Sequence, residues 1–320
     1  MLVRFWGTRG SLPVALTADS VRRKIANALV AADGRRFTDA AQAETFVETE
    51  LSFAAGATYG GASPCVELEA GHGPYFICDM GSGLRSFGLD SMRRNADGHS
   101  KTYNFFLSHL HWDHIMGFPF FAPSFDPEAT IRIHAAHPDA EQALRRQQEE
   151  ISFPVPFDWL RADIQFIQLS TGCAHEVDGV HVETKLQHHS HGSYGYRFTD
   201  GDGRVAIYST DSEHKLEKMA AEAAFIHFFR EADLVICDTM YSLADTISMK
   251  EDWGHSSNLV AIDLCHEAKA KILALFHHEP TYDDEAIQRM HEESIRYEEL
   301  TREGPPLDVI CAYDGLEVSI

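Results

Sequence analysis

Four side chains that can bind a metal ion fall within six consecutive positions of this sequence, directly after an apolar run: His109, His111, Asp113 and His114. Side chains alternate along a strand, so His109 and His111 project to the same side if the strand extends through them. Asp113 and His114 then lie in the turn that follows and can reach a second ion close by. Imidazole together with carboxylate suits zinc, and also manganese or iron. The spacing therefore predicts a metal site at the end of a buried strand.

Three more strand-like segments end in side chains of the same kinds. The candidates after these segments are His188, His189 and His191, then Asp211, and finally His277 and His278. Strands that each deliver a polar residue at one end place a site on a rigid scaffold. We therefore expect these segments to converge, with the choice within each group of histidines open at this point.

The elements that must position these residues can be read from periodicity and turn signals. Expected strands are 2–6, 64–70, 74–79, 103–108, 130–135, 179–186, 194–199, 204–209, 233–237, 271–276 and 307–311. Expected helices lie near 19–32, 38–54, 138–150, 215–230, 256–268 and 283–298. Hairpin-like strands followed by strand–helix alternation indicate the α/β (α+β) class, with sheets at the core and helices outside. Residues 15–56 are expected to be a helical insertion, either peripheral or a lid over the site.

Several segments spread along the chain resemble the metallo-β-lactamase superfamily, whose signature is His-x-His-x-Asp-His. The matching segments are 5–11, 59–61, 79–83, 109–114, 192–197, 210–211, 253–256 and 276–280. The chain is most similar to the phosphodiesterase branch, which includes ribonuclease Z and phosphoribosyl cyclic phosphodiesterases. The resemblance implies a four-layer αββα sandwich with mixed sheets, formed by one domain over residues 1–320. It also implies a dinuclear metal site at one edge of the two sheets.

By the family's pattern, one ion is bound by His109, His111 and His189, the other by Asp113, His114 and His277, and Asp211 bridges the two. His189 is preferred because it stands four residues before Ser193. The family usually has His-Pro-Gly-Gly-Ser there, whereas this chain has His-Ser-His-Gly-Ser, so His188 and His191 stay as alternatives. His277 is preferred to His278 because it directly follows the strand.

Three further residues are expected to support the metal site. Asp79 matches the superfamily's early aspartate and is expected to hold a ligand imidazole by its free N–H, with capping of a turn as the alternative. His255 precedes a helical run and is either part of an ordinary helix start or, as in ribonuclease Z-like enzymes, a residue that assists phosphodiester cleavage. Asp238 ends a strand in a position similar to that of a family carboxylate, where it could orient His255.

The implied activity is metal-dependent hydrolysis, in which a hydroxide generated at the two ions attacks a phosphodiester. His255, Asp113 and Asp211 are the expected catalytic residues, and the expected substrate is a small phosphodiester or cyclic nucleotide. Hydrolysis of a thioester, lactone or β-lactam on the same ions is the alternative. A relict metal-binding or partner-binding protein is the non-enzymatic reading, but all seven ligand positions are filled. Two divalent ions are expected, zinc before manganese or iron.

The composition of the chain limits the kinds of partner that it is expected to bind. The chain has 27 basic and 49 acidic residues, a formal charge of −22, which disfavours long nucleic acids. Two divalent ions would still make the site locally positive, which suits a small anionic substrate. No signal peptide or membrane span is evident, and six scattered cysteines without a CxxC pair fit a reducing cytoplasm. A homodimer stays open.

Overall fold

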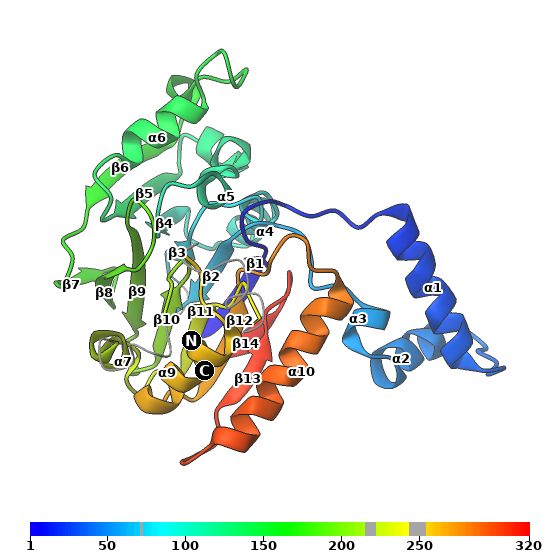
Figure 1. The fold of residues 1–320 in the computed structure, drawn as a ribbon. Helices are drawn as coiled ribbons and strands as arrows, with labels where there is room; N and C mark the ends of the chain where they lie inside the picture. Colours follow the sequence, from blue (N-terminus) through cyan, green and yellow to red (C-terminus); the bar gives the residue numbers. More distant parts are fainter. Residues whose placement is uncertain (71–72, 215–221, 243–253) are drawn as a thin grey trace.

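Two seven-stranded β-sheets face each other at the centre of the molecule, with helices outside both (Figure 1). The structure is a computed structural model that describes residues 1–70, 73–214, 222–242 and 254–320. Both sheets are mixed: β3 to β6 run parallel in the first sheet, and β10 to β13 run parallel in the second. The predicted αββα sandwich is confirmed.

The first sheet has the order β14-β1-β2-β3-β4-β5-β6. Its strands, in that order, are Glu317–Ser319, Leu2–Gly7, Cys65–Glu69, Tyr75–Cys78, Thr102–Leu107, Thr130–Ala135 and Asp163–Gln168. The second sheet has the order β13-β12-β11-β10-β9-β8-β7. Its strands, in that order, are Asp308–Cys311, Ile272–Phe276, Leu234–Asp238, Val205–Ser209, Ser193–Thr199, Val180–Gln187 and Ala174–Val177.

The helices cover the outer faces and the loops at the strand ends (Figure 1). The described α-helices are α1 (Ala18–Ala32), α2 (Ala40–Glu50), α3 (Phe53–Gly56), α4 (Leu84–Ala96), α5 (Trp112–Ile115), α6 (Ala140–Gln147), α7 (Ala223–Phe229), α9 (Asn258–Ala268) and α10 (Asp284–Thr301). Three short 3₁₀ turns span Phe118–Phe120, Ala122–Phe125 and Phe157–Trp159. Among the described residues, no helix combines the length and apolar character that a membrane crossing requires.

Three apolar layers hold the strands in place. Aromatic side chains such as Phe5, Phe106 and Phe276 fill the space between the sheets. A second layer packs α9 and α10 on the outer face of one sheet, and a third packs α4 and the 3₁₀ turns on the other. Strands β4 and β10 are buried almost throughout because both of their faces are covered. Burying one such aromatic side chain contributes roughly 1.5–3 kcal/mol, so the strand ends that carry the candidate ligands are rigidly held.

The elements differ from the sequence-based expectation in several places. Helix α4 and strands β6, β7 and β14 were not predicted. The helix expected over 38–54 is two helices, because the chain is extended at Leu51 and Ser52, and the Ser52 side chain caps α3. The helix expected over 215–230 lies partly outside the described residues, and the part inside them contains α7.

The expected insertion at 15–56 consists of α1, α2 and α3. Helices α1 and α2 project to one side of the sheets, and α3 lies beside α10 (Figure 1). Two contacts anchor the insertion to α10: the Ala54 N–H donates to Gln288 Oε1 at 2.9 Å, and Lys24 Nζ lies 2.8 Å from Asp284 Oδ2. No residue of the insertion lines the cavity that opens on the candidate metal ligands.

Candidate metal centre

The candidate ligands meet where strands of both sheets end. His109 follows β4, His189 follows β8, Asp211 follows β10 and His277 follows β12. Asp211 and His277 have positive φ angles of 47° and 63°. A side chain other than glycine is rarely held in this left-handed region, at a cost on the order of 1–3 kcal/mol. The surrounding packing therefore keeps these residues in a conformation that turns the chain sharply at the strand end.

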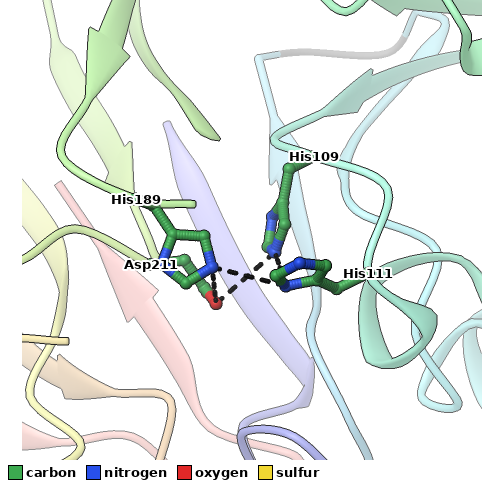
Figure 2. A group of neighbouring side chains, drawn as sticks. All are labelled: His109, His111, His189 and Asp211. Atoms are coloured by element: carbon green, nitrogen blue, oxygen red, sulfur yellow. Dashed lines mark hydrogen bonds and ion pairs between the residues drawn. The ribbon is translucent and has the colours of Figure 1, made fainter. Parts of the chain in front are cut away.

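The first group consists of three imidazoles and one carboxylate, shown in Figure 2: His109, His111, His189 and Asp211. His111 Nδ1 lies 2.9 Å from His109 Nε2 and 3.3 Å from His189 Nε2. Asp211 Oδ2 lies 3.5 Å from His109 Nε2 and 3.6 Å from His189 Nε2. These atoms surround one point, as the ligands of a single ion do.

The second group lies on the other side of Asp211 and consists of Asp113, His114 and His277. His114 Nε2 is 3.1 Å from Asp113 Oδ2 and 3.3 Å from His277 Nε2. Asp211 Oδ1 is 3.2 Å from the Nε2 atoms of both His114 and His277. One oxygen of Asp211 thus faces each group, which is the arrangement expected of a bridging carboxylate.

The hydrogen bonds on the outer side of the imidazoles decide where their protons lie. His189 Nδ1 is 2.9 Å from the Gly254 carbonyl oxygen, and His114 Nδ1 is 2.7 Å from Asp79 Oδ2. Both partners only accept hydrogen bonds, so both Nδ1 atoms carry a proton, and the Nε2 atoms are the ones that face the other candidate ligands. Burial lowers the pKa of His114, but Asp113, Asp211 and Asp79 outweigh burial and raise it well above its ordinary value, so this set of imidazoles and carboxylates favours a positive charge at its centre. A cation is needed to hold such a set together, so the residues fit a pair of divalent ions.

The Asp79 carboxylate accepts several of the hydrogen bonds that surround the candidate ligands. Its Oδ2 accepts hydrogen bonds from His114 Nδ1, from the Ser108 hydroxyl and from the Tyr208 hydroxyl, each at 2.7 Å. Since the Ser108 hydroxyl donates to Asp79, its oxygen accepts from His109 Nδ1 at 3.0 Å. Asp79 thus holds one imidazole directly and a second through Ser108, as the sequence predicted for a supporting carboxylate.

Burial and the neighbouring charges set the ionisation of the group. Burial lowers the pKa of His109 well below its ordinary value, which keeps that imidazole neutral. Burial alone would raise the pKa of Asp113 and Asp211, but the adjacent His114 and His277 lower it below the usual range. Both carboxylates are therefore ionised and supply negative charge to a bound cation.

The structure separates the histidines that the sequence left open. His189 reaches the first group, whereas the His188 ring packs 5.8 Å from that of His214 and 5.0 Å from that of Phe225. His191 lines the adjoining cavity. His278 points to the other side of the loop, where its Nε2 lies 2.7 Å from the Ala312 carbonyl oxygen.

His255 lies against the second group. Its ring stacks on that of His277 with centroids 5.2 Å apart, and its Nδ1 lies 2.8 Å from Asp238 Oδ2. Burial lowers the pKa of His255, but the contact with Asp238 and the charges of Asp211 and Asp113 outweigh burial and raise it to about 9. Trp253, which precedes this motif, lies outside the described residues.

Sequence reasoning missed two residues next to the ligands. The Ser11 N–H donates to Asp113 Oδ2 at 2.8 Å. A Cβ atom on Gly10 would lie 2.6 Å from His277 Nδ1, so only glycine fits beside that ring. Both residues belong to the segment 5–11, which resembled the superfamily but to which no role was given. A glycine next to a serine in a matched segment was the available signal.

A cavity of about 920 Å³ opens on the first group of ligands. His109 and His111 line this cavity, and Trp112, Phe120 and Arg146 are among its other lining residues. The Trp112 side chain is 79% exposed and that of Phe120 is 57% exposed, which is unusual for aromatic side chains and leaves their rings free to contact a ligand.

Comparison with known proteins places this geometry in a family. The model of the beta-lactamase superfamily domain matches residues 79–278, which include all seven candidate ligands. No curated protein matches the sequence.

Three solved structures illustrate the fold. The metallo-β-lactamase fold protein YhfI from Bacillus subtilis has a TM-score of 0.64 at 18% identity, over 99% of this chain and 98% of that one. A diphosphatase from the PhnP family has a TM-score of 0.62 at 18% identity, and the match covers 100% of this chain and 97% of that one. The short form of human tRNase Z has a TM-score of 0.60 at 18% identity, and the match covers 100% of this chain and 99% of that one. The chain therefore belongs to the beta-lactamase superfamily domain family and is a hydrolase with the metallo-β-lactamase fold.

Proposed function

We propose that this hydrolase is a phosphodiesterase that uses two divalent metal ions and acts on a small phosphodiester, such as a cyclic nucleotide. The observation that carries the proposal is His255, which stacks on the ligand candidate His277 and is held by Asp238. A proton donor placed beside the ions is what cleavage of a phosphodiester needs, because the leaving oxygen must be protonated. The kinship with structures of a diphosphatase and of a tRNase Z is consistent with this chemistry.

Two bound divalent ions would polarise a water molecule and the phosphoryl oxygens. The three imidazoles and Asp211 would hold one ion, and Asp113, His114 and His277 would hold the other. Zinc is the first choice because both groups combine imidazole nitrogens with carboxylate oxygens, with manganese or iron as the alternatives.

The chain's own residues do the rest. Because the Nδ1–H of His255 donates to Asp238, the Nε2 atom is the one left to face a substrate. The Asp238 carboxylate favours the protonated imidazole, so His255 can stabilise the charge on the phosphoryl group or give a proton to the leaving oxygen. The hydrogen bonds from Asp79 and Gly254 fix the orientation of ligand imidazoles before substrate binds.

The cavity suits a small anionic substrate with a flat ring. Arg146 is exposed at this cavity and offers a cation to a phosphate or phosphodiester. The exposed rings of Trp112 and Phe120 offer surfaces on which a nucleobase could stack. The formal charge of −22 opposes binding of long nucleic acids. The six cysteines are all free, and five of them are buried, which fits the proposed cytoplasmic location.

A substrate panel tests the proposal. The purified protein, loaded with zinc or with manganese, would be assayed on bis-p-nitrophenyl phosphate, cyclic nucleotides, a thioester and nitrocefin. We expect turnover of the phosphodiesters, at least two ions per chain by elemental analysis, and loss of turnover in His255→Ala. Faster turnover of the thioester or of nitrocefin would favour the alternative hydrolase, and metal content well below two would favour a relict site.

A further inference from the structure

A second cluster of metal-binding side chains lies beside the candidate centre and takes no part in it. It consists of His188, His214 and Glu222, whose ligand atoms all lie within 4.8 Å of one another. Two imidazoles and one carboxylate are the ligand types of zinc sites that keep a fourth position open. His188 is exposed, so that position would face solvent, whereas His214 and Glu222 are 2% and 3% exposed.

The distances within the cluster are not those of a completed hydrogen-bond network. His214 Nδ1 lies 2.8 Å from Glu222 Oε2, which is a hydrogen bond. The other oxygen, Glu222 Oε1, lies 3.8 Å from His188 Nε2. This separation is too long for a hydrogen bond. It is near the spacing of two ligands on one ion, since two bonds of roughly 2.0–2.2 Å at a tetrahedral angle separate their ends by about 3.5 Å.

The elements around the cluster hold it in place. Glu222 is the N-cap residue of α7, and the Phe225 ring on the first turn of that helix packs 4.4 Å from the ring of His214. Two charged side chains lie close by. Lys185 Nζ lies 4.3 Å from the centroid of Phe225 and opposes a cation, whereas the carboxylate of Glu213 favours one. Glu222 acts on His188 more strongly than either Lys185 or Glu213, so its buried carboxylate makes the site favourable to a cation.

The cluster is connected to the loops that carry the ligands of the main centre. His188 directly precedes His189, and its carbonyl oxygen accepts from the Glu213 N–H at 2.8 Å. The Ser212 hydroxyl lies 3.1 Å from His214 Nε2, and Ser212 directly follows the bridging Asp211. Any ion that joins His188 to His214 therefore ties the loop after β8 to the loop after β10.

We propose that His188, His214 and Glu222 form a third metal site, separate from the two ions of the main centre, for Zn²⁺ or a similar transition-metal ion. Binding at His214 Nδ1 would shift the proton of this imidazole to Nε2, which would then donate to the Ser212 hydroxyl 3.1 Å away, so the imidazole binds the ion in its neutral form. The bound ion would hold the loops of His189 and Asp211 in their observed positions. The site is thus expected to stabilise the fold and the main centre without touching the substrate.

Metal counting tests the proposal. The full-length protein would be equilibrated with Zn²⁺, freed of loosely bound ions, and analysed for zinc per chain, alongside His188→Ala and Glu222→Gln. We expect each variant to hold one ion fewer than the unmodified protein. We also expect Zn²⁺ to raise the melting temperature of each variant less than it raises that of the unmodified protein. His188 is exposed, so His188→Ala keeps the test valid if Glu222→Gln fails to fold. His181→Ala is the matched control, because His181 lies on β8, the strand that leads to His188, and its Nδ1 is 3.5 Å from Glu176 Oε2.

A variant of the main centre shows whether the sites are separate. His111→Ala should lose ions of the main centre but keep the one bound at His188. Substitution with Co²⁺ adds a spectroscopic measure, since a tetrahedral cobalt site absorbs in the visible range and His188→Ala should remove only part of that absorption. Equal zinc content in the unmodified protein and in His188→Ala would overturn the proposal. So would the loss of all ions in His188→Ala, because the histidine would then serve the main centre.

Discussion

Asp238 Oδ2 lies 2.8 Å from His255 Nδ1 and 3.3 Å from the backbone nitrogen of Ser212, so one carboxylate oxygen connects the candidate acid to the loop that carries the bridging Asp211. Asp238 is fully buried at the end of β11. The sequence suggested that this carboxylate, which ends a strand in a position similar to that of a family carboxylate, could orient His255. The observed contact gives it a role: it fixes the tautomer and the orientation of His255 and stabilises its charged form.

Replacing Asp238 by asparagine should therefore damage catalysis without emptying the metal site. The amide cannot stabilise an imidazolium, and groups of this kind typically contribute about 10–100-fold to activity. We expect kcat for bis-p-nitrophenyl phosphate to fall by that factor, with KM and the metal content little changed. Asp233→Asn, at the other end of the same strand and paired with Lys271, is the control. An equal loss in both variants would mean that the effect is structural.

Removing the imidazole of His255 should lower kcat more than removing the carboxylate that holds it. His255→Ala is expected to lower kcat by about 10²–10⁴-fold, the usual contribution of a general acid or base. Because the group acts in the transition state, KM should change little. Steady-state kinetics and elemental analysis on the same preparation measure both effects. His266→Ala, on the helix that follows, is the control, since its ring contacts Glu298 away from the site. A normal turnover number in His255→Ala would exclude the role.

The hydrogen bonds that Asp79 accepts predict a loss of metal affinity in Asp79→Asn. An amide oxygen no longer favours the N–H of His114 as a carboxylate does, and supporting residues of this kind typically change affinity by about 10–100-fold. Competition with a chelator of known affinity would measure the change. Tyr208→Phe removes one neutral donor to Asp79 and should have a smaller effect. Unchanged affinity in Asp79→Asn would leave this aspartate with only its role in the turn.

The structure brings together the candidate ligands that the sequence singled out, whereas several of the elements around them were not predicted. Ligands such as His109 and Asp211 stand directly after long apolar strands, so one local pattern gives both the strand and the position of the side chain. Helix α4 was missed because its sequence is polar and has two basic residues near its end, Arg93 and Arg94, so only a narrow face of the helix is apolar. That face packs against β3 and β4, where the Phe87 ring contacts those of Tyr75 and Tyr103, a contact that local periodicity does not encode.

Other residues of the site depend on contacts that are distant in sequence. The choice of His189 over His188 rests on the carbonyl oxygen of Gly254, which is 65 residues away. The Ser11 N–H reaches Asp113 over 102 residues. No spacing rule gives such pairs, because they arise only when strands that are distant in sequence assemble into one sheet. The family's pattern nonetheless selected His189, which shows what a resemblance adds to local reasoning.

The cavity beside the metal ligands predicts a specific effect of Trp112→Ala. Stacking of a base on an aromatic ring contributes about 1–3 kcal/mol, which corresponds to roughly 5–150-fold in affinity. KM for a cyclic nucleotide should therefore rise in this range, whereas turnover of saturating substrate should be nearly unchanged. Trp159→Ala is the control because that ring is 66% exposed but does not line the cavity. Equal KM values for Trp112→Ala and the unmodified protein would remove Trp112 from substrate recognition.

The buried histidine His134 is expected to make the stability of the fold depend on pH, independently of the metal centre. Its ring stacks on Phe106, its Nε2 lies 3.2 Å from Asn104 Oδ1, and its buried Nδ1 has no hydrogen-bond partner among the described residues. A proton on Nδ1 would place an unpaired donor and a charge in the core. Burial therefore lowers the pKa of His134 to about 4.

The direction of the pH effect on stability follows from comparison with the unfolded chain, in which the pKa of this histidine is about 6.5. Above that pH both states are neutral and stability is complete. Between pH 6.5 and 4 the unfolded state binds the proton and the folded state does not, so up to about 3 kcal/mol of stability is lost as the pH falls. His134→Gln keeps a donor toward Asn104 but cannot titrate, so its urea unfolding free energy should depend less on pH over this range. His181→Gln, at an exposed position, should keep the full dependence, and identical pH profiles for all three proteins would contradict the assignment.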